Sequence, residues 1–327
     1  MTSDLARSRL ISIPALAGAM RLDQYLASTA AVSSRAQAKA LIDGGQVLVD
    51  GRVRKAGALL RGGEVVEIRQ LARESSADPG AEDIPLRILY EDTDLIAVDK
   101  PAGMVVHPAP GSPTGTLVNA LLHRGLVTEG AAGNRPGIVH RLDKETSGVL
   151  LVARTLRAHE MLARAFRERT VRKRYLALVL GEPKPRDGIL TWSIGRHPRE
   201  RQRMSIHSRS GRAARTTYRV IESFRDLSLL ELQPETGRTH QIRVHLAALG
   251  HPVLADPLYG SRKGRALPKG GPGREFARQA LHAAEIELLH PTTGAPLHVV
   301  APLPEDLRVL LEKLRSARAD FELTPQN

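Results

Sequence analysis

The chain of 327 residues contains no cysteine. This absence excludes disulfides, thiolate-bound zinc, iron–sulfur clusters and cysteine nucleophiles, and it suits a cytoplasmic protein. Aromatic residues make up only 3% of the chain, which disfavours a surface that binds single-stranded nucleic acid by stacking many bases. No apolar run is long enough to cross a bilayer. The first residues resemble a signal peptide, but Asp4 and Pro14 interrupt the pattern, so we predict no export.

Two glycine-rich signatures are also missing. The sequence has neither G-x-x-x-x-G-K-[ST] nor G-x-G-x-x-G, so phosphoryl transfer and dinucleotide binding lack their usual loops. His240, His245 and His251 could suggest a metal site. However, residues five apart on a helix do not share a face, and His251 follows the expected helix end at Gly250. We therefore expect no metal site.

Positive charge, in contrast, is abundant and clustered. The formal net charge is +13. Residues 164–174 hold six basic residues and one acid, and residues 196–219 hold eight arginines and one acid. A merely solvated face would interleave acids with these cations, so the placement predicts a polyanionic partner. Because aromatics are scarce, we expect a structured RNA that is held by its backbone.

The sequence pattern predicts two unequal domains of a mixed α+β protein. An N-terminal strand and extension covers residues 1–19, and a small unit with two helices and a hairpin at Asp50-Gly51 covers 20–70. A small, polar and acidic stretch at 71–83 has the composition of a linker. Many short strands with occasional helices follow over 84–318, which indicates a large, mainly antiparallel mixed sheet. Residues 319–327 are expected to form a C-terminal tail.

The small unit resembles the S4 RNA-binding domain. The resemblance rests on "RLDQYLA", "SRAQAKALIDGGQVLVDG" and "GGEVVEI", in register over about fifty residues. Basic residues on the second helix and around the hairpin are suited to phosphate contacts. The expected RNA-binding residues are Arg35, Lys39, Arg52, Arg54 and Lys55.

Two polar segments of the large domain carry the candidate chemistry. In "GIVHRLDKETSGVLLVAR", residues 137–154, a polar loop that contains Asp143 lies between two apolar runs that read as buried strands. In "ETGRTHQIRVHLAALGHPVLADPLYG", residues 235–260, Arg238 precedes a helix expected to begin at Thr239. A cation at a helix N-terminus opposes the helix dipole, so we expect Arg238 to be stabilised by an anion, and Asp143 is the obvious candidate.

These two segments resemble the catalytic and C-terminal motifs of the RNA pseudouridine synthases, and "RKRYLALV" and "QALHA" match two further family segments in the same order. The resemblance implies a catalytic Asp143 paired with Arg238 and a catalytic Tyr175 that packs on the detached base and helps to remove the C5 proton. It also implies that Arg141 enters the space of a flipped base and that Leu281 is a pocket residue. The basic Lys173 and Arg174 beside Tyr175 are expected to contact RNA.

Together with the S4 unit and "GMVVHPAPGSPTGTLVNALLHR", the resemblance is strongest to the branch that isomerises uridine to pseudouridine in large-subunit (23S) ribosomal RNA. Where that branch often reads D-K-D-T-T-G, this chain reads D-K-E-T-S-G. The implied reaction breaks the N1–C1′ bond, rotates the uracil and joins C5 to C1′, so it needs no cofactor. Charge develops at C1′ as in glycoside hydrolysis, and Asp143 could stabilise it, attack C1′ or take the 2′ proton.

Two other functions stay open at this point. The chain could be a non-catalytic RNA-binding or ribosome-assembly factor, or a nucleosidase that hydrolyses the same glycosidic bond. An intact set of Asp143, Tyr175 and Arg238 argues against the first, and product mass separates the second, because isomerisation leaves the mass unchanged. The expected partner is structured large-subunit ribosomal RNA, free or in a pre-assembled particle. We expect a monomer that contacts no membrane.

Overall fold

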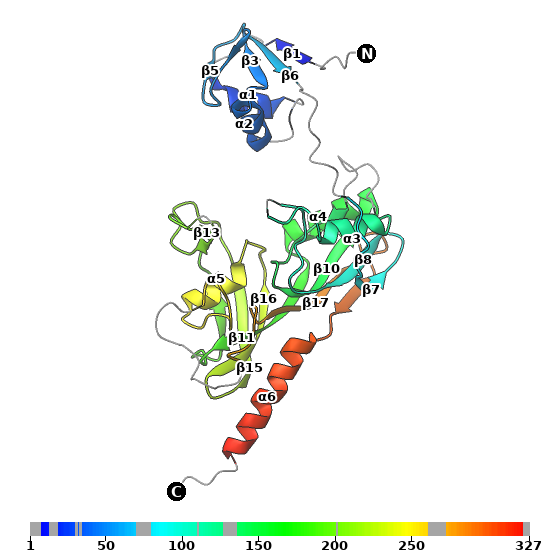
Figure 1. The fold of residues 1–327 in the computed structure, drawn as a ribbon, viewed down its shortest axis with the longest axis vertical. Helices are drawn as coiled ribbons and strands as arrows, with labels where there is room; N and C mark the ends of the chain where they lie inside the picture. The colour runs from blue at the N-terminus through cyan, green and yellow to red at the C-terminus, as the bar shows by residue number, and fades with distance from the viewer. Residues whose placement is uncertain are drawn as a thin grey trace. The chain divides into compact units, whose positions relative to one another are not determined.

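The computed structural model describes residues 8–12, 19–29, 32, 35–69, 80–109, 111–126, 136–200, 202–260 and 273–322. The chain divides into two compact units, Met1–Asp78 and Pro79–Asn327 (Figure 1). Most of the linker expected at 71–83 lies outside the described residues, as does the end of the tail expected at 319–327. The part of that tail at 319–322 continues the last helix.

The small unit contains two helices and two sheets. Its helices are α1 (Leu22–Ser28) and α2 (Arg35–Asp43), and its strands are β1 (Ser8–Ser12), β2 (Met20–Arg21), β3 (Val47–Val49), β4 (Arg52–Val53), β5 (Leu59–Leu60) and β6 (Val65–Arg69). Four strands pair in the order β1-β6-β3-β4, and β2 pairs with β5. The N-terminal strand therefore belongs to this unit. Apolar side chains of both helices and of the sheet share one core.

Turn chemistry fixes the hairpin of the small unit. Asp50 and Gly51 have φ values of 50° and 73°, which is the two-residue turn that suits the twist of paired strands. The Asp50 carboxylate also accepts a hydrogen bond from the backbone N–H of Val65 at 2.9 Å. The hairpin expected from the sequence is thereby confirmed, with β3 antiparallel to β4.

The large unit is built on a ten-stranded sheet in the order β12-β15-β16-β11-β17-β10-β8-β7, with β18 on β17 and β9 on β10. Its strands are β7 (Arg87–Glu91), β8 (Leu95–Lys100), β9 (Gly137–Ile138), β10 (Ser147–Ala153), β11 (Arg172–Leu180), β12 (Asp187–Leu190), β15 (Thr216–Ser223), β16 (Leu227–Pro234), β17 (Leu281–Leu289) and β18 (Pro296–Val300). A separate hairpin pairs β13 (Gly195–Arg196) with β14 (Met204–Ser205). Only β10 and β17 run parallel in the pairs described, so the predicted mixed, mainly antiparallel α+β fold is confirmed.

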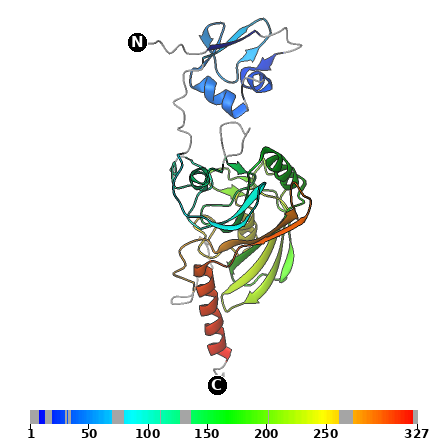
Figure 2. The same cartoon turned by 90° about the vertical axis from the view of Figure 1, so that its right-hand side faces the viewer.

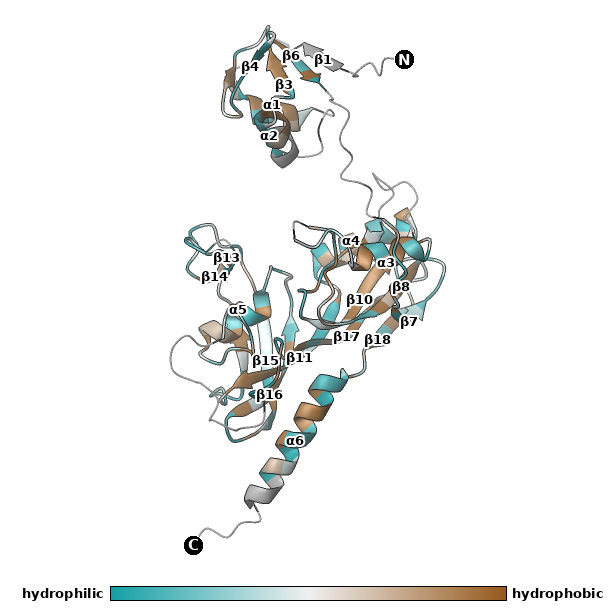
Figure 3. Cartoon of the chain, viewed as in Figure 1, coloured by the Kyte–Doolittle hydropathy of each residue, from teal (hydrophilic) through white to brown (hydrophobic). Residues whose placement is uncertain are grey.

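Helices cover the sheet on both faces. They are α3 (Leu117–His123), α4 (Leu156–Glu168), α5 (Gln241–Ala248) and α6 (Glu305–Glu322). Alternate residues of β8 and β10 join two separate cores, one that includes α4 and one that includes α3. Burial on both faces explains why β10 is apolar along nearly its whole length (Figure 3).

The other half of the sheet packs against α5 and α6. Side chains of α5 and four leucines of α6 share a core with β11, β15 and β16. Figures 1 and 2 show α6 running along this half of the large unit. None of the described helices has the length and apolar character needed to cross a membrane.

Candidate active site

The Asp143 loop connects β9 to β10 and is held by hydrogen bonds from three neighbouring residues. The Lys144 carbonyl accepts hydrogen bonds from the Lys100 ammonium at 3.1 Å and from the Gly103 backbone at 2.9 Å. The Gln279 amide donates to the Thr146 hydroxyl at 2.7 Å. Because these bonds hold the residues that follow Asp143, the carboxylate is presented from a fixed backbone.

Gly148, where the loop enters β10, allows β17 to approach very closely. A Cβ at this position would lie 2.1 Å from the Ala283 carbonyl oxygen, and Gly148 has a φ of 116°. Only glycine combines this conformation with this contact. The close contact lets β10 and β17 run parallel next to the loop, at Ser147–His282 and Gly148–Ala283.

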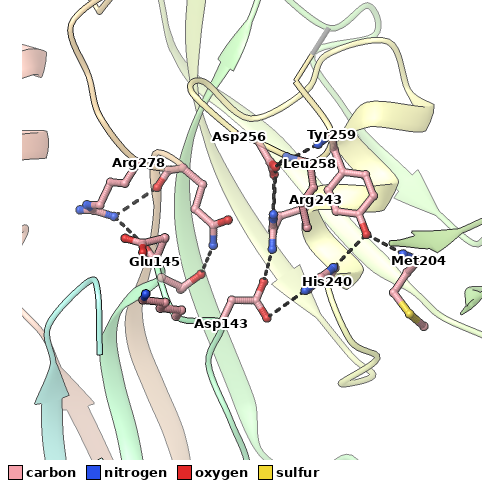
Figure 4. Close-up of polar contacts among 12 residues, drawn as sticks. Asp143, Glu145, Met204, His240, Arg243, Asp256, Leu258, Tyr259 and Arg278 are labelled. Carbon is pink, nitrogen blue, oxygen red and sulfur yellow. Dashed lines mark hydrogen bonds and ion pairs between the residues drawn. The ribbon is translucent and has the colours of Figure 1, made fainter. Parts of the chain in front are cut away.

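Arg243, on α5, joins two carboxylates (Figure 4). Its Nη1 donates to Asp143 at 2.8 Å, and its Nε and Nη2 donate to the two oxygens of Asp256 at 2.7 and 2.9 Å. The Arg243 side chain is 4% exposed and that of Asp143 is 19% exposed. The two carboxylates raise the pKa of Arg243 above its ordinary value, although burial opposes this. The guanidinium therefore stays charged and aims one oxygen of Asp143.

The predicted pairing of Asp143 with Arg238 is wrong in this structure. Arg238 donates from Nε to the Ala213 carbonyl at 3.2 Å, and the helix begins at Gln241 rather than at Thr239. Arg243 lies two residues inside α5, which is buried over most of its length. The sequence did contain a signal for Arg243. An arginine within such an apolar helix is buried, and a buried guanidinium requires acidic partners.

His240 faces the other oxygen of Asp143, with its Nε2 at 3.9 Å. Its Nδ1 lies 2.9 Å from the Tyr259 hydroxyl, and that hydroxyl accepts from the Met204 backbone N–H. The hydroxyl can donate its own proton to Nδ1, and in that arrangement the proton of a neutral imidazole is on Nε2, toward Asp143. Burial lowers the pKa of His240 and the nearby Asp143 opposes that effect.

Asp143 lines a cavity of about 770 Å³ that also contains Tyr175, Leu281 and Arg141. Tyr175 lies on β11 opposite a bulge of β17, where Ala284 is the extra residue between the paired Ala283 and Glu285. Burial, together with the negative charge of Asp143, raises the pKa of Tyr175, so its phenol stays protonated at neutral pH. Leu281 is buried in the cavity wall, and Arg141 is exposed at it. The structure thus brings together four of the residues named from the sequence.

The cavity is strongly cationic. Asp143 is the single carboxylate among the described residues that line it. The cations that line it are Arg141, Arg167, Arg169, Lys173, Arg212, Arg238 and Arg243. Burial lowers the pKa of Lys173 to about 8, so most of its charge is kept at neutral pH. Such a lining suits a ligand that carries many negative charges and places one uncharged group in the cavity.

Arg174 does not belong to this surface. It lies between Glu231, at 3.2 Å, and Glu285, while its strand neighbours Lys173 and Tyr175 line the cavity. Successive residues of a strand point to opposite faces, so Arg174 is directed away from the cavity. Arg174 thus does not line the cavity, and its contact with RNA stays a prediction.

Two of the five cations expected to bind RNA in the small unit have acidic partners. Arg35 donates to Asp23 at 2.9 Å, and Lys39 forms an ion pair with Asp43. The remaining three are exposed, and no acid partner is found for them within the described part of the chain. They are Arg52, Arg54 and Lys55.

Two groups of side chains away from the cavity have the spacing of metal ligands. Asp92, Asp94 and His290 form one, and Glu285, Glu287 and His298 form the other. Asp92 already accepts hydrogen bonds from Tyr90, His290 and the backbone at residues 94 and 95. These contacts account for the first group as an intramolecular network.

Comparison with known proteins agrees with this site. Residues 94–248 match the RNA pseudouridylate synthase family, and residues 20–66 match the S4 domain. Ribosomal large subunit pseudouridine synthase D of Xanthomonas campestris is 46% identical over 315 residues, which cover 94% of this chain and 93% of that protein. The protein of the same name from Pseudomonas aeruginosa is 42% identical, with coverages of 96% and 98%.

The chain belongs to the RNA pseudouridine synthase family. A solved structure, human RNA pseudouridylate synthase domain containing 4, is 30% identical with a TM-score of 0.55 and covers 70% of this chain and 93% of its own. As an RNA pseudouridine synthase, the protein is an isomerase that acts on uridine in RNA. The expected family and the expected S4 domain are both confirmed.

Proposed function

We propose that this RNA pseudouridine synthase modifies specific uridines of large-subunit (23S) ribosomal RNA, and that it does so in the cytoplasm as a monomer. The observation that carries the proposal is the Asp143 carboxylate, held by the buried Arg243 in a cationic cavity. The choice of RNA is supported by the printed names of relatives that match nearly the whole chain.

We assign the central chemistry to Asp143. Breaking the N1–C1′ bond builds positive charge at C1′, and an oriented carboxylate opposes it. Arg243 occupies one oxygen of Asp143, which leaves the other free toward the cavity and His240. That oxygen can stabilise C1′, attack it, or take the 2′ proton. In each case the detached uracil rotates and C5 joins C1′, while any bond that Asp143 formed to C1′ or to the 2′ proton is broken again. The C5 proton then leaves to water and N1 takes up a proton, so the net change is an isomerisation.

Tyr175 and Leu281 would hold the detached base between them. The raised pKa of Tyr175 makes its phenol a donor rather than a base, so we assign it packing and hydrogen bonding instead of removal of the C5 proton. Water has to be excluded while C1′ is reactive, and the buried Leu281 serves that purpose.

Arg141 would occupy the space that the target base leaves. Removing a base from its stack costs a few kcal/mol, and an exposed cation at the cavity can offset part of that loss by stacking and by contact with phosphates. The S4 unit, with its exposed Arg52, Arg54 and Lys55, would add affinity and placement through phosphate contacts.

The test is pseudouridine mapping of ribosomal and transfer RNA from cells with and without this gene. The proposal predicts that specific pseudouridines of 23S RNA disappear and that restoring the gene restores them. Loss confined to transfer RNA would contradict the proposed substrate. Unchanged mapping, or a product mass that shows base release, would instead support an RNA-binding factor or a nucleosidase. Sedimentation of the purified protein tests the monomer.

A further inference from the structure

Three of the cavity's arginines form a cluster whose function the proposed chemistry does not explain. They come from three separate segments of the large unit: Arg169 follows α4, Arg212 lies between β14 and β15, and Arg238 precedes α5. All three line the cavity that contains Asp143. Segments distant in the sequence thus bring three like charges to one place.

The cluster has no acidic partner within the described part of the chain. Arginines nearby in the sequence do have one: Arg215 pairs with Glu235, and Arg203 pairs with Glu200 at 3.0 Å. Burial and the charges of Arg212 and Arg169 lower the pKa of Arg238, so both of these cations act on the Arg238 guanidinium. An arrangement that is unfavourable when empty becomes favourable when an anion binds.

Arg169 lies where glycine would be less strained. It ends α4 with a φ of 61°, in the left-handed region that glycine most often adopts at a helix end. Strain in a residue with a β-carbon suggests that its side chain has a function. Here the side chain lines the cavity.

The orientation of the Arg238 side chain also suits the binding of an anion. Its Nε donates to the Ala213 carbonyl at 3.2 Å, and its backbone N–H donates to the Gln241 side chain at 3.0 Å. The two Nη groups have no further partner among the described residues. They form the planar pair of donors that matches two oxygens of one phosphate.

We propose that Arg169, Arg212 and Arg238 form a binding site for one phosphate of the RNA backbone, next to the nucleotide that enters the cavity. The inference rests on the proposed function, because it takes RNA as the ligand. Its effect would be to fix the sugar of that nucleotide relative to Asp143, so that the glycosidic bond reaches the carboxylate. The corrected Arg238 thereby becomes a positioning residue that binds substrate.

The experiment has two arms: one removes the charge of the phosphate, and the other removes the charge of an arginine. The probe is the short stem-loop of large-subunit RNA that the purified protein protects from nuclease, prepared with a single uncharged methylphosphonate at each loop linkage in turn. With wild-type protein, one linkage should weaken filter binding on the order of tenfold, the effect of one charged hydrogen bond. Arg212→Gln should weaken binding of the unmodified RNA by a similar factor.

The decisive result is the combination. If the three arginines bind that phosphate, Arg212→Gln protein should lose about threefold or less at the sensitive linkage rather than about tenfold, because one of the three cations on that phosphate is already gone. Arg209→Gln is the matched control. It removes an exposed arginine three residues away that does not line the cavity, and it should keep the full sensitivity. Equal losses for Arg212→Gln and wild type at every linkage would overturn the proposal.

Arg169→Gly adds a test that separates function from stability. It removes the cation and the strain together, so the melting temperature should stay equal or rise while RNA binding falls as for Arg212→Gln. A variant that melts lower and binds normally would show that Arg169 is structural. Because these measurements use binding alone, they remain readable if the stem-loop yields no pseudouridine, a result that would count against the proposed function instead.

Discussion

Replacing Arg243 by lysine is the most discriminating perturbation of the carboxylate geometry. Arg243→Lys keeps the positive charge but loses the planar set of donors. The arginine makes three bonds to two carboxylates, whereas a lysine ammonium at the end of a narrower chain can hold one of those carboxylates well. Asp143 or Asp256 is therefore left without its fixed partner.

Two consequences of different size follow. Two charged hydrogen bonds are lost, each worth about 1.5–3 kcal/mol, and the retained charge recovers part of this, so we expect a stability loss of about 3 kcal/mol. The effect on catalysis should be larger. A reacting group displaced by about 1 Å can lose about 10²-fold in rate, and a released Asp143 side chain moves at least that far. We expect kcat to fall by about 10²–10³-fold while RNA affinity changes little.

The assay is tritium release from 5-tritiated uridine in a large-subunit RNA transcript at saturating RNA, with filter binding and thermal melting in parallel. Arg209→Lys is the matched comparison: it removes the planar donors of an exposed arginine that does not line the cavity, so it should keep kcat within about threefold. A kcat for Arg243→Lys within tenfold of wild type, or an equal kcat loss for Arg209→Lys, would refute the assignment of Arg243 as the partner of Asp143.

Three further predictions follow from the structure. Gly148→Ala, whose Cβ would lie 2.1 Å from Ala283, should lower the free energy of unfolding in urea by at least about 4 kcal/mol. Gly80→Ala, whose Cβ would have nothing within 4 Å, should leave it nearly unchanged. Burial lowers the pKa of His282 to about 4, below its unfolded value. Its contribution to the free energy of unfolding, on the order of 3 kcal/mol, is therefore present above about pH 6.5 and is lost as pH falls toward 4. His282→Gln should remove that pH dependence, and an unchanged slope of stability against pH would contradict the reasoning. Deleting residues 1–78 should raise KM for RNA and reduce the salt dependence of binding while kcat on a saturating stem-loop is kept; loss of kcat in a folded truncation would show that the small unit helps to build the active site.

Local chemistry in the sequence predicted much of the fold. Asp50-Gly51 predicted a hairpin because few other pairs adopt its two positive φ values. The uninterrupted apolar run after Gly148 predicted a strand buried on both faces. The position of Asp143 between two strands followed from the same pattern, since loops that carry function are held by rigid elements.

The partner of Asp143 could not be predicted in the same way. Asp143 and Arg243 are one hundred residues apart, and their contact depends on how α5 packs beside the loop. The sequence suggested Arg238 because it looked like a cation at a helix N-terminus. The structure begins α5 two residues later, after His240 in a left-handed conformation, and this changes which arginine points inward.

The orientation of Arg174 away from the cavity could have been predicted from the sequence. Once Tyr175 is placed in the cavity, strand alternation requires its neighbours to face the other way. Counting basic residues along "RKR" ignored that rule. The glutamates opposite Arg174, at 231 and 285, lie on two other strands, so their identity as partners needed the sheet order.

The measurement that tests the central claim most directly is pseudouridine formation by Asp143→Asn. Asparagine keeps the shape of the side chain, and Arg243 keeps its two bonds to Asp256, so the variant should fold and bind RNA. It lacks the charge, the nucleophile and the base that the mechanism needs. Tritium release should fall by about four orders of magnitude with unchanged filter binding. A variant that binds RNA normally and turns over within tenfold of wild type would contradict the assignment of Asp143 and the mechanism built on it.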